Sequence, residues 1–291
     1  MKYIPTLRFP RILSGAIAVL LFGNAAESVR AATFNWANLP GLGNFSVPGN
    51  WGGTVPTGLD PTDILVFGGD VGTTGFLTNY TATNDIAVNP FLLNRLLLQA
   101  TTTTPGTGPV DTIVGTTALL FVGVNPTITQ SGTAAVVINE PITLGANLLL
   151  TGSPVVGTDT AHDKANVTFN GTLSGNFDIT KSGTSTFRFG SPGTAGISDN
   201  TWFGTLRIDD GTIRFNNNAY TAPTALRANP VVMNSATALL TTQFKQLSTV
   251  LPTPTGFDPE SSLRLGTLSG SAGTVEAVSG QPRTFRQCRQ Q

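Results

Sequence analysis

The densest set of ionisable residues in the chain is His162-Asp163-Lys164, which contains the only histidine. An imidazole beside a carboxylate and an amine could supply a general acid or base. Nucleophilic catalysis also needs a third group that orients the base, and the neighbouring sequence offers none. A polar loop is therefore the preferred interpretation of this segment.

Two pairs of carboxylates are close enough in sequence to suggest glycoside hydrolysis, in which two acids about 5 to 10 Å apart flank the scissile bond. Asp60 and Asp63 flank a proline in a turn and are expected to cap backbone N–H groups. Asp209 and Asp210 are adjacent, so their side chains point to opposite sides of an extended chain. With one cysteine and one histidine, the usual zinc and triad chemistries lack their groups. We therefore predict no catalytic residues, no cofactor-binding residues and no metal ligands.

Carbohydrate binding without cleavage is the remaining chemistry that the residues suggest. Trp36 and Trp51 could form a platform for a pyranose ring, and the alternative is that both rings plug the end of a β core. Four arginines, at positions 188, 207, 214 and 264, could line one face of the coil and bind an acidic glycan. The alternative is a solvated face balanced by acidic neighbours. The possible glycan contacts are Trp36, Trp51, Arg188, Arg207 and Arg214.

The charge of the chain excludes several partners. There are 16 basic and 16 acidic residues among 291, and only 11% of residues are charged, against roughly a quarter in an average soluble protein. Such a chain lacks the cations that attract nucleic acid or anionic lipid. We therefore expect no nucleic-acid partner.

The N-terminus has the charge order of a secretory signal. Basic residues precede an apolar stretch at residues 12–22, which is too short to span a bilayer, and small residues follow it. We expect cleavage after Ala31, with cleavage after Ala26 as the alternative. No later segment is apolar enough for a transmembrane helix, so the mature protein is expected to be secreted or on the cell surface, without spanning the membrane.

Short repeated segments in the second half of the chain indicate a coil of strands. One pattern of a hydroxyl residue, an apolar residue, arginine and an apolar residue occurs at residues 186–189, 205–208, 212–215 and 262–265. This alternation predicts strands with one buried face and a wet arginine face. Gly-Thr-Leu-Ser-Gly occurs at residues 171–175 and again at 266–270, which indicates a duplicated unit that stacks on its copies.

The resulting expectation is an all-β parallel solenoid, and a β-sandwich is the alternative. In a second alternative, Asp210-Gly211 is a tight hairpin turn between antiparallel strands at residues 205–208 and 212–215. The residues expected in the interior of the coil are Leu173, Phe177, Ile179, Phe187, Phe189, Leu206, Ile208, Ile213 and Phe215.

Residues 171–189 and 202–215 resemble the autotransporter-associated β-strand repeat. Thr180-Lys-Ser-Gly183 matches the Thr-Lys-x-Gly step of that repeat, and Gly211-Thr-Ile-Arg-Phe215 matches its last strand. The block that contains Trp36 and Asn50-Trp51 is similar to the stretch that often precedes such repeats. One departure is Trp202-Phe-Gly-Thr205, where the family usually has tyrosine.

This resemblance implies a right-handed parallel β-helix, secreted or displayed on the cell surface as in adhesins and passenger domains, and it carries over no catalytic residues. The sequence then divides into a signal peptide (1–31), a Trp/Gly/Pro-rich N-terminal cap with the first coils (32–160), a β-strand repeat region (161–280) and an irregular tail (281–291). The tail is either a genuine soluble end or the result of truncation or a frame shift.

The functional expectation is an exported structural or adhesion-type β-solenoid without catalysis. Its expected partners are an extracellular polysaccharide or the surface of a host or neighbouring cell. The alternative is a secreted carbohydrate-binding or carbohydrate-active β-helix protein.

Overall fold

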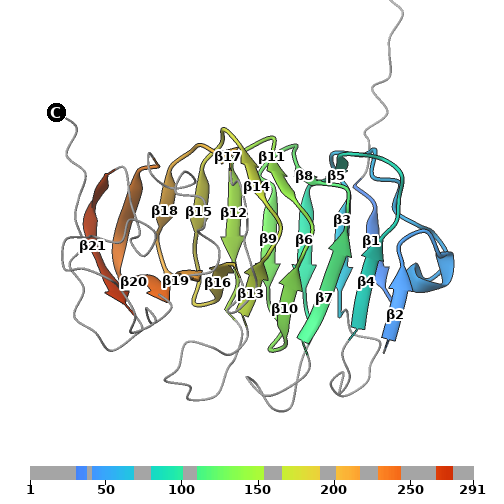
Figure 1. Cartoon of the computed structure of the whole chain (residues 1–291), viewed down its shortest axis with the longest axis horizontal. Helices are drawn as coiled ribbons and strands as arrows, with labels where there is room; N and C mark the ends of the chain where they lie inside the picture. Colours follow the sequence, from blue (N-terminus) through green and yellow to red (C-terminus); the bar gives the residue numbers. More distant parts are fainter. Residues whose placement is uncertain are drawn as a thin grey trace, which may run out of the picture.

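Parallel β-strands stand side by side along the long axis of the molecule, with β1 and β2 at one end and β21 at the other (Figure 1). The computed structural model describes residues 31–37, 41–68, 80–100, 110–153, 166–190, 201–216, 229–243 and 267–277. The predicted signal peptide, except Ala31, and the predicted tail lie outside these residues. His162 and Arg264 also lie outside them.

The strands form three parallel ladders, and consecutive strands of the chain belong to different ladders. The first ladder contains β1 (Thr33–Trp36), β3 (Ile64–Phe67), β6 (Arg95–Leu98), β9 (Thr127–Gln130), β12 (Leu148–Thr151), β15 (Ile179–Lys181) and β18 (Leu206–Ile208). The second contains β2 (Gly41–Asn44), β4 (Tyr80–Asn84), β7 (Val110–Gly115), β10 (Ala135–Ile138), β13 (Asn166–Phe169), β16 (Thr186–Phe189) and β19 (Gly211–Asn216).

The third ladder is shorter and forms a separate five-stranded sheet. Its strands are β5 (Phe91–Leu93), β8 (Leu119–Phe121), β11 (Ile142–Leu144), β14 (Leu173–Gly175) and β17 (Thr201–Trp202). The first and second ladders join through β20 (Val231–Gln243), which pairs with β18 near its start and with β19 near its end. With β21 (Leu268–Ala277) they make one 16-stranded sheet. The predicted parallel β-solenoid is therefore confirmed, and the β-sandwich is wrong.

Asp210-Gly211 forms a corner of the coil. β18 pairs with β15 and β20, whereas β19 pairs with β16 and β20, and all these pairings are parallel. Gly211 has a φ of 69°, a conformation that costs glycine little. The Asp210 Oδ1 atom accepts a hydrogen bond from the Gly211 N–H at 2.8 Å. The alternative of a hairpin is wrong, and the favoured coil is confirmed, because each strand buries its inner face only when it stacks on the neighbouring coils.

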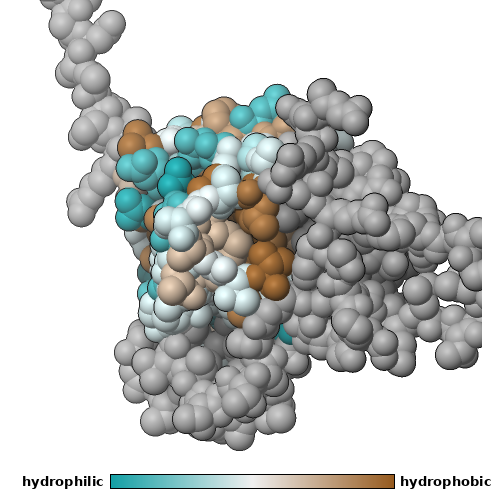
Figure 2. Space-filling view, turned by 90° about the vertical axis from the view of Figure 1, so that its left-hand side faces the viewer, coloured by the Kyte–Doolittle hydropathy of each residue, from teal (hydrophilic) through white to brown (hydrophobic). Residues whose placement is uncertain are grey.

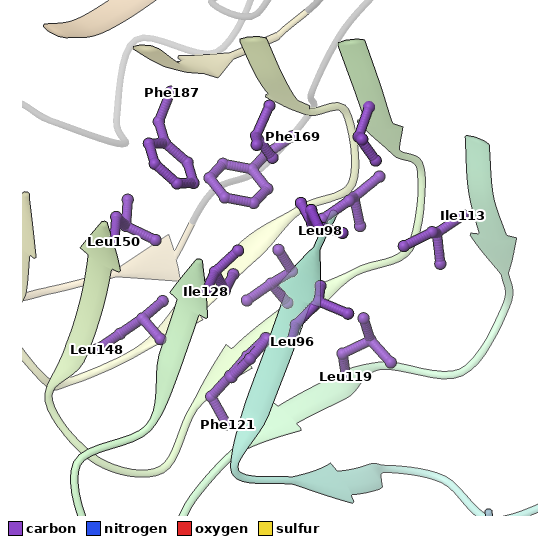
Figure 3. Close-up of a cluster of buried hydrophobic side chains, with 14 of the residues drawn as sticks. Leu96, Leu98, Ile113, Leu119, Phe121, Ile128, Leu148, Leu150, Phe169 and Phe187 are labelled. Atoms are coloured by element: carbon purple, nitrogen blue, oxygen red, sulfur yellow. The ribbon is translucent and has the colours of Figure 1, made fainter. Parts of the chain in front are cut away.

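The core consists of columns of inward-facing side chains, one from each coil. In the second ladder the register aligns phenylalanine rings, with centroids 5.3 Å apart for Phe169 and Phe189 and 5.2 Å apart for Phe189 and Phe215. Figure 3 shows inner side chains of all three ladders converging, including Leu98, Phe121 and Phe169. Strands of three to six residues therefore share one continuous core.

Eight of the nine residues predicted in the interior are buried, namely Leu173, Ile179, Phe187, Phe189, Leu206, Ile208, Ile213 and Phe215. The prediction for Phe177 is wrong, since 39% of its surface is exposed. Phe177 lies at the corner between β14 and β15, where the alternation of a strand no longer applies.

Polar side chains hold the same corner by bonding from one coil to the next. Asn147 Oδ1 accepts a hydrogen bond from the Asp178 N–H at 3.0 Å, and Asp178 Oδ1 accepts one from the Thr205 N–H at 2.7 Å. These bonds satisfy backbone donors outside the ladders. The bond between Asn147 and Asp178 also spans the predicted division near residue 160, on both sides of which the ladders continue.

Replacing a phenylalanine of the inner column should cost far more than replacing one at a corner. We expect Phe187→Ala to lower the free energy of unfolding by about 3–5 kcal/mol, because Phe187 is fully buried. Phe203→Ala removes a ring that is 56% exposed, so the free energy of unfolding should change by less than about 0.5 kcal/mol. Denaturant unfolding of both variants checks this, and equal losses would contradict a core built from stacked columns.

Candidate functional site

The two tryptophans proposed as a sugar platform lie inside an aromatic cluster at the N-terminal end. Trp36 is 1% exposed and Trp51 5% exposed, and their rings meet edge to face with centroids 4.9 Å apart. Phe45 and Phe67 pack on both rings, with centroids 5.0 to 5.8 Å away. Trp51 Nε1 donates a hydrogen bond to the Phe45 carbonyl at 2.8 Å. Neither indole has a free face for a sugar, so this geometry favours the plug.

Arg188, Arg207 and Arg214 do not share one face of the solenoid. Arg188 and Arg214 are neighbours in register on the outer side of the second ladder, whereas Arg207 is on the first. Arg207 is exposed, and its Nη1 atom is 4.0 Å from Asp209 Oδ1. Arg188 is half-buried and Arg214 is 2% exposed. The prediction that the Arg214 side chain is exposed to solvent is therefore wrong. Of the three, Arg207 is the one most accessible to a glycan.

Each of the two carboxylate pairs serves the backbone or a neighbour. Asp60 Oδ1 accepts hydrogen bonds from the N–H and the hydroxyl of Thr62 at 2.8 and 2.7 Å, as expected for a turn cap. Asp209 Oδ1 accepts one from Asn234 Nδ2 at 3.0 Å, while Asp210 bonds to the corner at Gly211. The described residues contain no group of three or more His, Cys, Asp or Glu side chains that could hold a metal ion.

Two exposed phenylalanines lie on neighbouring coils at the corner between the third and first ladders. The Phe203 N–H donates to the Gly175 carbonyl, and Trp202 Nε1 donates to the Phe177 carbonyl at 2.7 Å. These bonds bring Phe203 beside the corner that carries Phe177. The sequence analysis placed Phe177 inside and did not single out Phe203. Both residues lie near a glycine in a turn, where period-two alternation does not predict a buried side chain.

The sequence reasoning also missed two carboxylic acids inside the coil. Asp111 occupies the inner column of the second ladder between Tyr80 and Val136, and it is 2% exposed. Burial raises its pKa to about 7, against a weak opposing bond of 3.4 Å from the Tyr80 N–H. The signal was available in the sequence, since Asp111 is two residues before the inward-facing Ile113.

Glu140 occupies space that a glycine leaves open. It is fully buried at the corner after β10, and a Cβ atom on Gly115 would clash with its Oε1 atom. Burial raises the pKa of Glu140 to about 8, and the nearby Asn84 amide opposes this shift. Neither carboxyl oxygen has a hydrogen-bond partner among the described residues. A neutral carboxylic acid fits this site better than a carboxylate.

Lys181 is the one cation in the inner columns of the described coils, and it belongs to the Thr-Lys-x-Gly step. Its register neighbours are Leu150 and Ile208, both fully buried. Its Nζ atom donates to the carbonyls of Ser182, Gly183 and Asp210, so it links the corners of two successive coils. Burial lowers the pKa of Lys181 to about 8, although the charge of Asp210 raises it.

Of these buried groups, Lys181 ties two corners together, whereas Asp111 and Glu140 are buried with few or no hydrogen-bond partners among the described residues. Phe177 and Phe203 are the exposed aromatic side chains among the described residues. No helix among the described residues has the length and hydrophobicity to cross a membrane.

Comparison with known proteins finds no match to the chain among protein-family models, curated proteins or solved structures. The fold defines a class, the parallel β-solenoids. The likeness to the autotransporter-associated repeat stays a prediction that rests on the residue pattern.

The buried acids should make the protein more stable at pH 5 than at pH 8. Burial, together with the charge of Asp60, also raises the pKa of Asp63 to about 6. All three acids thus have folded-state pKa values above their unfolded values, so the folded state keeps protons that the unfolded state releases. The free energy of unfolding should therefore fall as pH rises from about 5 to about 8. Denaturant unfolding across this range measures the slope.

Matched amide variants assign that slope to particular residues. Asp111→Asn and Glu140→Gln should each reduce it, because each removes one titrating group. Asp85→Asn is the control: burial raises the pKa of Asp85, but hydrogen bonds from Ser46 outweigh this and leave it below its ordinary value. An unchanged slope in the two amide variants would contradict buried protonation.

Removing the Lys181 ammonium group should destabilise two corners at once. We expect Lys181→Met to lower the free energy of unfolding by about 3 kcal/mol, because three partly buried carbonyls lose their donor while an unbranched apolar stem is kept. Arg207→Met removes an exposed cation and should cost less than about 1 kcal/mol. Thermal and denaturant unfolding compare the two, and similar losses would argue against the role of Lys181 at the corners.

Proposed function

We propose that the protein is an exported β-solenoid without catalysis, which serves as a stalk or adhesion element outside the cytoplasm. The observation that carries the proposal is the continuous core, which connects coils from β1 to β20 through side chains in register. Such a stack is a stiff rod that can hold a surface at a distance. The buried Lys181 joins the corners of two successive coils, which is consistent with a structural role.

Export is supported by the order of basic and apolar residues at the N-terminus. The test is to produce the full gene product in a bacterial host and determine the N-terminus of the protein recovered outside the cytoplasm. We expect it to begin at Ala32, or at Glu27 if cleavage follows Ala26. An intact N-terminus on protein that stays in the cytoplasm would overturn export.

Carbohydrate binding is the second candidate, and the exposed rings of Phe177 and Phe203 favour it over the buried tryptophans. Aromatic faces pack well against the apolar face of a sugar ring. Arg207 is exposed on the adjoining ladder and could bind an acidic glycan.

Incubation with neutral and acidic polysaccharides separates these functions. We expect no shortening of the polysaccharide, and any binding should fall at least about fivefold in Phe177→Ala/Phe203→Ala, a loss of about 1 kcal/mol. Leu42→Ala/Val47→Ala is the control, because these residues are exposed at the opposite end. Shortening of the polysaccharide that an Asp or His substitution abolishes would overturn the non-catalytic proposal.

A further inference from the structure

The corner between the third and first ladders has the same length on three successive coils. It consists of residues 145–147 between β11 and β12, residues 176–178 between β14 and β15, and residues 203–205 between β17 and β18. The strands on both sides of these segments pair in register. Phe177 therefore aligns with Ala146 on the preceding coil and with Gly204 on the following one.

The ring of Phe177 stands between two positions that carry almost no side chain. Ala146 has one methyl group and Gly204 has none. A Cβ atom on Gly204 would clash with the Phe177 carbonyl oxygen, so the close approach of the two coils requires glycine there. Phe177 is 39% exposed, and Phe203, next to Gly204, is 56% exposed. A flat ligand therefore has room to lie against the Phe177 ring, with the ring of Phe203 beside it.

A column of hydrogen-bonding side chains runs beside these rings. Asn147, Asp178 and Thr205 align in register. The Oδ1 atoms of Asn147 and Asp178 each accept a hydrogen bond from the backbone N–H of the next coil. Both residues are exposed, so the amide nitrogen of Asn147 and the second carboxylate oxygen of Asp178 can bond to a ligand. The corner thus offers a donor and an acceptor on adjacent coils, about 4.8 Å apart along the solenoid.

Exposed hydrophobic residues also lie at the end of the solenoid that carries β21. Figure 2 faces this end and shows hydrophobic residues uncovered between hydrophilic and nearly neutral ones. Leu268, at the start of β21, is 38% exposed. Its side chain is aliphatic, whereas a sugar ring packs best on an aromatic face. The corner at Phe177 therefore matches a sugar better than this end does.

We propose that this corner binds a sugar residue of a neutral polysaccharide, with the apolar face of the pyranose ring on Phe177 and its hydroxyl groups bonded to Asn147 and Asp178. A pyranose has an apolar face and a rim of hydroxyl groups, and the corner supplies an aromatic face beside a donor and an acceptor. The inference rests on the second candidate function, carbohydrate binding, and it names the class of sugar and the residues that recognise it.

The charges around the corner favour a neutral sugar over an acidic one. Asp178 places a carboxylate in the site itself. The nearby cation, Arg207, has its Nη1 atom 4.0 Å from Asp209 Oδ1, so it already faces a carboxylate. Two carboxylates against one guanidinium group leave an excess negative charge that repels a uronic acid. Sugar hydroxyl groups, in contrast, donate charge-assisted hydrogen bonds to Asp178.

Calorimetric titration of the purified protein with oligosaccharides tests the proposal. The neutral probes are cellohexaose, mannohexaose and laminarihexaose, and the acidic counterpart is the hexamer of galacturonic acid. We expect at least one neutral probe to bind more tightly than the acidic one. Phe177→Leu should raise the dissociation constant of that probe at least about fivefold, because it keeps an apolar side chain and removes the aromatic face. Phe177→Tyr keeps that face and should bind like the wild-type protein.

Asp178→Asn separates the charge of this residue from its structural bond. The asparagine side chain keeps an oxygen that accepts from the Thr205 N–H. The dissociation constant of the neutral probe should rise about threefold because the charge-assisted bonds are lost, whereas that of the acidic hexamer should fall. Val47→Ala is the control and should change neither value, because Val47 is exposed at the opposite end of the solenoid.

The outcomes distinguish the site from the function on which it rests. If a neutral probe binds and Phe177→Leu leaves its affinity unchanged, the site is wrong and carbohydrate binding stands. Tighter binding of the acidic hexamer than of every neutral probe would contradict the proposed class of sugar. If none of the three neutral probes binds, both the site and the second candidate function are wrong, while export and the stalk are tested separately by the N-terminus of the protein.

Discussion

The register of the parallel ladders is the constraint on which the rest of the structure depends. Parallel pairing places each inner side chain directly above its counterpart in the preceding coil, so every coil must offer a side chain that packs on the one before it. The column of Phe169, Phe189 and Phe215, whose rings pack on one another in register, is the clearest result. A strand of three or four residues buries little by itself, and the core becomes large enough only because the columns continue from coil to coil.

Two of the buried ionisable residues, Lys181 and Glu140, lie where the backbone makes room or partners for them. The Lys181 ammonium group lies among carbonyls of two corners, and its stem packs with Leu150 and Ile208. Glu140 lies where Gly115 leaves room, and burial favours its neutral form. Such groups cost stability when they are charged without a partner. The ammonium group of Lys181 and the side chain of Glu140 lie at corners, whereas Asp111 lies within β7, where burial raises its pKa and favours its neutral form.

The side chains that do not belong to the core lie on the outer faces and at the ends of the solenoid. The outer faces have hydroxyl ladders, such as Thr143 with Ser174 at 2.9 Å and Ser182 with Thr151 at 3.0 Å. Charged side chains are few in the chain, at 11% of its residues. The exposed rings of Phe177 and Phe203 lie at a corner of these outer faces, while the cluster of Trp36, Trp51, Phe45 and Phe67 closes the N-terminal end of the described coils.

The sequence by itself determined the fold class and most of the inner residues, because period-two alternation in the segments around Phe187, Leu206 and Ile213 requires one buried face, and the repeated segments require stacking. The tertiary structure decided what lies between the strands and outside them. Phe177 is exposed because a corner ends the alternation, and Arg214 is buried although its position alternates outward. Trp36 and Trp51 became a plug through contacts between β1, η1 and β3 that no local pattern encodes. Local alternation specifies which side of a strand faces inward. The neighbouring coils and covering segments decide how exposed to solvent each side chain is.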